Sequence, residues 1–112
     1  HALTTLNDTT FVEAARVLAQ RAMTEGGAED AGRLRVAFRH AVGRVPTEAE
    51  VDILRGALDR QRRLYAGDRA AAERLLKVGE SRRDERLDVV QHAALTAVCT
   101  LILNLDETLT KQ

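Results

Sequence analysis

Three histidines and one cysteine are the residues of this sequence best suited to bind a metal ion. His92 and Cys99 are seven positions apart, which in a helix is two turns and about 10 Å, too far to share one metal. His40 lies near the end of an expected helix, where a solvated imidazole facing the helix dipole is the simpler interpretation. Cys99 has no partner for an intramolecular disulfide and lies in an apolar run, so we expect a buried, unreactive thiol. These residues predict no metal, haem or other cofactor.

Polar residues near the two ends of the chain could do acid–base chemistry if the ends meet. They are Asn7 and Asp8, and Asp106 and Glu107. Paired carboxylates work as acid and base when burial shifts a pKa, and the sequence gives no sign of burial here. The simpler interpretation is that they cap helix ends in solvent. A polar seam formed by these four residues is the alternative hypothesis, a ligand-binding or enzymatic site completed by residues upstream of the chain.

Two clusters of arginine could bind an anionic partner if they converge. Arg60, Arg62 and Arg63 end one expected helix, and Arg82 and Arg83 lie in the charged segment GESRRDER. Arginine near a helix C-terminus and mixed charge in a loop are also typical of a solvated surface. We treat the five arginines as candidate partner-binding residues.

Motifs for covalent catalysis and for phosphate binding are missing from the sequence. Its one serine, Ser81, lies in the charged segment and not in a nucleophile context, and neither GxGxxG nor a Walker loop occurs. No nucleophile, base or metal group therefore supports catalysis, and we expect the chain not to be an enzyme.

Composition limits the class of protein further. The 112 residues carry 17 basic and 17 acidic side chains, and 45% of them are hydrophobic, as in a single globular domain. Zero net charge and 3% aromatic residues disfavour nucleic-acid binding. The longest apolar run, residues 93–103, is about half of a membrane crossing, so we expect no membrane insertion.

Five helices account for the pattern of apolar residues, capping residues and glycines. Thr47 and Glu50 form a capping box that begins one helix, and Gly43 and Pro46 mark the turn before it. The predicted helices cover approximately residues 9–25, 30–42, 48–65, 69–77 and 89–107.

The last of these helices is apolar over most of its circumference, which is typical of the central helix of a bundle. We therefore predict an all-α fold, a compact bundle of about five helices with the C-terminal apolar helix at its centre. Any side of that helix that the bundle leaves uncovered would be a docking surface.

Several segments occur in an order that resembles a known family. They are ALTTLND, FVEAAR, FRHAVGRVPTEAE, VGES and LNLDE, at residues 2–8, 11–16, 38–50, 78–81 and 103–107. Together they resemble the C-terminal part of the planctomycete-specific domain of unknown function that accompanies planctomycete cytochrome c-type domains. Thr9 and Thr108 depart from the proline and the aromatic residue common at those positions, which puts any role of the C-terminal aromatic in doubt.

The resemblance implies a setting and no mechanism. Family proteins are long and usually exported, and their haem chemistry belongs to a different part of the protein. Our leading hypothesis is that residues 1–112 form one helical domain, a fragment of a larger exported bacterial protein, with a non-catalytic structural or interaction role. The expected partner is the rest of the parent chain or another protein, and self-association stays open.

Overall fold

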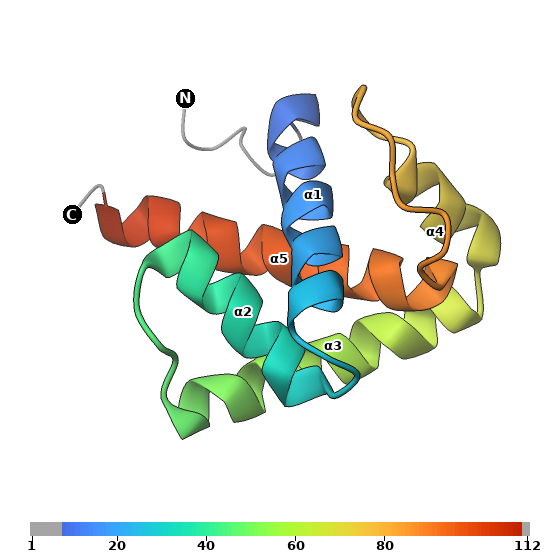
Figure 1. The fold of residues 1–112 in the computed structure, drawn as a ribbon. Coiled ribbons are helices and arrows are strands. Elements are labelled where there is room, and N and C mark those ends of the chain that lie inside the picture. Colours follow the sequence, from blue (N-terminus) through green and yellow to red (C-terminus); the bar gives the residue numbers. More distant parts are fainter. Residues whose placement is uncertain (1–7, 111–112) are drawn as a thin grey trace.

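The computed structural model describes the backbone of residues 8–110 and the side chains of residues 8–105. This part of the chain forms five helices and contains no strand (Figure 1). The helices are α1 (Thr9–Glu25), α2 (Asp30–Val42), α3 (Glu48–Ala66), α4 (Arg69–Leu76) and α5 (Val89–Thr110). The all-α prediction is confirmed, and the predicted helix limits differ from the observed ones by three residues at most.

Aspartate and threonine side chains begin most of these helices, as the sequence predicts. The Asp8 carboxylate accepts a hydrogen bond from the Thr10 N–H at 2.7 Å, and Asp88 accepts one from the Gln91 N–H at 2.9 Å. Asp68 caps α4 in the same way. Only α2 begins without a side-chain cap among the four helices whose N-cap residue is characterised. Local capping therefore sets where the helices start.

The turn between α2 and α3 is built from neighbouring residues. Gly43 ends α2 with a φ of 91°, which is the left-handed conformation that glycine adopts without strain. Thr47 and Glu50 make both hydrogen bonds of the predicted capping box. The Arg44 guanidinium donates two hydrogen bonds to the same Glu50 carboxylate, at 2.9 and 2.8 Å. These contacts, with the Arg44 bonds first, lower the pKa of Glu50 to about 2.

Helix α5 is the centre of the bundle and packs against each of the other four helices. Figure 1 shows α1 crossing α5, α2 and α3 lying side by side below it, and α4 beside the N-terminal end of α5. The chain is compact, since its radius of gyration of 13.1 Å matches the roughly 13 Å expected for a folded domain of this length.

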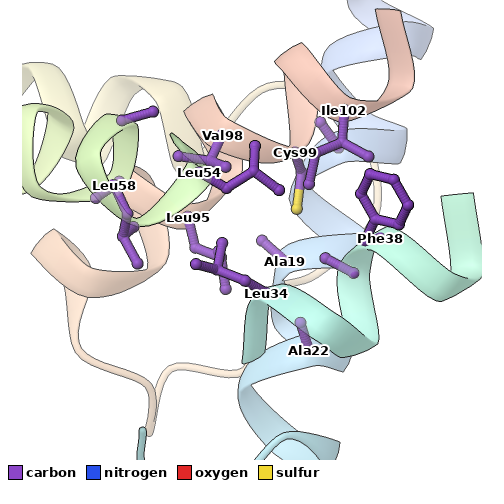
Figure 2. Close-up of a cluster of buried hydrophobic side chains, with 14 of the residues drawn as sticks. Ala19, Ala22, Leu34, Phe38, Leu54, Leu58, Leu95, Val98, Cys99 and Ile102 are labelled. Atoms are coloured by element: carbon purple, nitrogen blue, oxygen red, sulfur yellow. The ribbon is translucent and has the colours of Figure 1, made fainter. Parts of the chain in front are cut away.

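Small side chains let the helices approach closely in the core (Figure 2). Alanines of α1 and α2 share the core with larger side chains from α3 and α5, and all of them are buried. Cys99 is fully buried among them, and burial raises the pKa of its thiol, as expected for an unreactive cysteine. The main core contains Ala15, Ala19, Ala22, Met23, Leu34, Ala37, Phe38, Leu54, Ala57, Leu58, Ala94, Leu95, Val98, Cys99 and Ile102.

Candidate functional site

The charged segment 78–88 joins α4 to α5 and is fixed to the bundle by polar side chains. We call the residues that fix it the polar junction: Glu13, Arg16 and Gln20 of α1, Arg83 of the segment, and His92 of α5. The partners of α1 in these bonds lie more than 60 positions away in the sequence. The mixed charge of the segment predicted a solvated loop, and this junction was not predicted.

Arg16 is the centre of the polar junction, with only 1% of its surface exposed. Its Nε donates a hydrogen bond to the Val78 carbonyl at 3.0 Å, and its Nη2 donates one to the Ser81 carbonyl at 2.6 Å. The Glu13 carboxylate lies 3.9 Å from Nη2 and supplies the opposite charge. A buried guanidinium is stable only with such partners, so α1 and the segment hold each other in place.

Glu13 binds the backbone at the start of the segment. Its carboxylate accepts hydrogen bonds from the backbone N–H groups of Glu80 and Ser81, at 3.1 and 2.7 Å. Bonds from the Ser81 side chain and backbone hold the pKa of Glu13 below its usual range. Gly79 has a φ of 88°, and a Cβ atom at this position would collide with the Glu13 carboxylate. The positive φ therefore favours glycine at position 79, and a larger residue would also displace the Glu13 carboxylate from its hydrogen bonds.

His92 completes the polar junction from α5 and is fully buried. Arg83 Nη1 lies 2.8 Å from His92 Nδ1, and a guanidinium can only donate, so Nδ1 must accept. The proton of the imidazole is then on Nε2, which donates to the Arg16 carbonyl at 3.1 Å. Burial, with the nearby charges of Arg83 and Arg16, lowers the pKa of His92. His92 is therefore a neutral structural histidine with a fixed tautomer.

Two segments of the family resemblance meet in this junction. Glu13 and Arg16 belong to FVEAAR, and Val78, Gly79 and Ser81 belong to VGES. One feature of the sequence could have indicated this contact. Arg16 directly follows Ala15 and lies with it on the buried face of α1. A charged residue on an apolar face needs a partner from elsewhere in the fold.

A cleft of about 790 Å³ lies between α4 and the segment that the polar junction holds. Leu76 and Val89 supply its apolar lining, and Lys77 and Arg82 supply exposed positive charge. Lys77 and Arg82 take part in no ion pair or side-chain hydrogen bond within the described residues. Glu85 also lines the cleft without a partner there. The cleft therefore combines an apolar surface with two unpaired cations and one unpaired carboxylate, and this excess of positive charge favours an acidic partner.

The arginines of the two predicted clusters have different roles in the structure, and Arg62 bonds within the chain. Arg62 donates hydrogen bonds to Asp30 at 2.6 Å and to Asp59 at 2.8 Å, and a further one to Gln91. The Arg62 bond holds the pKa of Asp30 below its usual range. Arg62 therefore ties α3 to α2 and α5, which the sequence analysis did not foresee.

The other candidate arginines differ in exposure. Arg83 is half-buried and bonds to His92 and to the Leu87 carbonyl, so it is also engaged within the chain. Arg60, Arg63 and Arg82 are exposed. Of the five candidates, these three have side chains free to meet a partner.

The predicted polar seam falls mostly outside the described residues. Asn7 lies outside the described backbone, and the side chains of Asp106 and Glu107 lie outside the described side chains. Asp8 is exposed and caps α1. The seam as an active site stays a prediction.

Within the part of the chain that the structure describes, no group of three or more His, Cys, Asp or Glu side chains could hold a metal ion. Residues 8–110 include no helix with the length and hydropathy of a membrane span. His40 is partly exposed and lies 3.3 Å from Glu25, as a surface pair.

Comparison with known proteins gives one match. A family model described as a protein of unknown function (DUF1553) matches residues 1–58, which contain α1, α2 and the first half of α3. Neither a curated protein nor a solved structure matches the chain. Because the match covers more than half of the 112 residues, the chain belongs to this family of proteins of unknown function, DUF1553.

Proposed function

We propose that this chain is a non-catalytic helical interaction module of a larger bacterial protein, and that the cleft beside α4 docks an acidic segment. That segment belongs to the parent chain or to another protein. The observation that carries the proposal is the pair Lys77 and Arg82, two exposed cations without partners beside an apolar surface. An extended segment with one acidic and one apolar side chain would complement both features.

The polar junction supports this role because it fixes one wall of the cleft. Arg16 and Glu13 hold the backbone of residues 78–81, and Arg83 is held by His92. A wall fixed in this way loses little conformational entropy when a partner binds. The side chains of the junction are occupied by structural hydrogen bonds, which fits a scaffold better than a reacting centre.

The finer setting comes from the family resemblance. It suggests a planctomycete protein that is exported and whose other parts include a cytochrome c-type domain. In that setting any haem would belong to the other domain, and the present chain would contribute packing and docking. The proposal therefore includes export of the protein and the presence of a cytochrome c-type domain in another part of it.

Photocrosslinking in the source bacterium tests the docking site. A photoreactive amino acid at position 85 lies in the cleft, and the same group at the exposed position 39 is the control. We expect position 85 to crosslink to one acidic segment and position 39 not to reach it. The double variant Lys77→Glu with Arg82→Glu should abolish the crosslink and leave the helical circular dichroism spectrum unchanged. A crosslink that survives the charge reversal, or equal crosslinking from both positions, would refute the proposal.

A further inference from the structure

Helix α3 has a second stripe of residues on the side that faces away from the core. Its members follow one another at intervals of four, three, four and four positions, which places them on one helix face. They are Ala49, Ile53, Gly56, Arg60 and Leu64, which we call the outer stripe. Ile53 is 70% exposed and Leu64 is 57% exposed, although both are large and apolar.

Gly56 in the middle of this stripe has no explanation inside the chain. Glycine in a helix interior costs about 1 kcal/mol relative to alanine. A Cβ atom added at Gly56 would meet only the end of the flexible Arg60 side chain, at 3.6 Å. The packing of this chain therefore does not need a glycine there. A helix that crosses α3 at this point would need one, because a missing side chain lets two backbones approach closely.

Charge is distributed unevenly along the same face. Asp52 lies four positions before Gly56, and Arg60 and Arg63 lie four and seven positions after it. All three side chains are exposed, and none has an ion pair or side-chain hydrogen bond to another described residue. Along the outer stripe, the unpaired charge is thus negative at Asp52, before the glycine, and positive at Arg60 and Arg63, after it. Arg55 is also exposed, but its position on the helix lies away from this stripe.

We propose that the outer stripe pairs with the same stripe of a second copy of this chain, with the two α3 helices antiparallel and crossing at Gly56. Antiparallel pairing places residues that lie equally far before and after the crossing opposite each other. Asp52 of each copy then faces Arg60 of the other. Ile53 packs on the aliphatic part of that arginine, and Leu64 packs over Ala49. The interface is its own complement, as a two-fold dimer requires.

Such a contact forms a weak dimer. One pair of crossing helices buries less than the roughly 1,200 Å² of a standard stable interface. Association should therefore depend on concentration, with a dissociation constant in the micromolar to millimolar range.

Sedimentation equilibrium over a concentration series tests the pairing through its charges. Asp52→Arg and Arg60→Asp should each weaken dimerisation by about tenfold or more, because each places like charges opposite one another. The double variant D52R/R60D reverses both charges and should restore the dimer to near the wild-type affinity. A protein that is monomeric at every concentration, or a double variant weaker than both single variants, would overturn the proposal.

Three further variants distinguish effects on the dimer interface from effects on the fold. Ile53→Asp should abolish the dimer, whereas Leu101→Asp, at an exposed leucine of α5, should leave it intact. Gly56→Ala should raise the melting temperature by a few degrees and yet weaken the dimer. A Gly56→Ala protein that is more stable and dimerises as well as the wild type would refute the crossing at Gly56. The charge reversal in the α4 cleft should not affect dimerisation, so this inference and the proposed docking site can fail independently.

Discussion

The turn between α2 and α3 and the segment between α4 and α5 are held in place in different ways. In the first, the Arg44 and Thr47 bonds to Glu50 all join residues within six positions of one another. In the second, Arg16 reaches 62 positions to Val78 and 65 to Ser81, and His92 reaches 76 positions back to the Arg16 carbonyl.

This difference decides what each region depends on. The α2–α3 turn can form from local contacts alone, because the residues that bond to each other lie within six positions in the sequence. Segment 78–88 has no fixed position until α1 and α5 have packed together. The bonds that Arg16 and His92 make to hold it are also more buried than the bonds of the turn, so losing one of them leaves a polar group with less access to water. Substitutions in the segment's anchors should therefore cost more than comparable substitutions in the turn.

Arg16→Met should give the largest effect. Methionine keeps the apolar stem and removes the buried guanidinium, which leaves the Val78 and Ser81 carbonyls without their donor and the Glu13 carboxylate without its counter-charge. We expect the free energy of unfolding to fall by about 3 kcal/mol, measured by urea denaturation. Arg44→Met, which removes an exposed ion pair in the α2–α3 turn, is the matched control and should cost much less. Equal losses in the two proteins would contradict the comparison.

Gly79→Ala should come next. Alanine at this position meets both the positive φ and the Glu13 carboxylate, and we expect a loss of roughly 2–3 kcal/mol. Gly27 has a similar φ of 79° but no atom within 4 Å of an added Cβ. Gly27→Ala should therefore cost only about 1 kcal/mol. The difference between the two melting temperatures isolates the contact with Glu13, and its absence would show that the carboxylate moves aside freely.

A pH titration of stability should detect His92. Burial lowers its pKa in the folded chain below the ordinary value of 6.5, so the unfolded chain binds more protons around that pH. Stability is then complete above about pH 6.5 and falls as the pH drops below it, by at most about 1.4 kcal/mol per unit. The lowered carboxylate pKa values, such as those of Glu13 and Asp84, act at lower pH.

His92→Gln is the control for that titration, because an amide can donate to the Arg16 carbonyl and accept from Arg83 without titrating. The variant should lose the slope between about pH 5 and pH 7. The same slope in both proteins would assign it to another histidine.

Thr47→Ala should give the smallest effect, and it tests whether a change in the α2–α3 turn stays local. It removes one bond of the capping box, and we expect a loss of about 1 kcal/mol. Hydrogen exchange should quicken at the start of α3 and stay unchanged in segment 78–88. Faster exchange in both regions would mean that the turn is not the independent unit that its local contacts imply.

The five helices could be predicted from the sequence, because caps and helical periodicity depend on residues a few positions apart. The Thr47 capping box, the Gly43 end of α2 and the central position of α5 were all predicted correctly. The candidate arginines could not be ranked in the same way. Whether Arg62 meets Asp30 or solvent depends on how α3 lies against α2, and sequence spacing does not contain that information.

The polar junction and the cleft beside it could be recognised only in the folded chain. Val78–Ser81 could be recognised as charged and turn-like, but its partners on α1 lie more than 60 positions away. The outer stripe of α3 is an intermediate case. The spacing of its residues can be seen in the sequence, but only the folded chain shows that Ile53 and Leu64 face outward. Local interactions can be inferred from neighbouring residues, whereas a buried charge finds its partner only when the packed helices bring the two together.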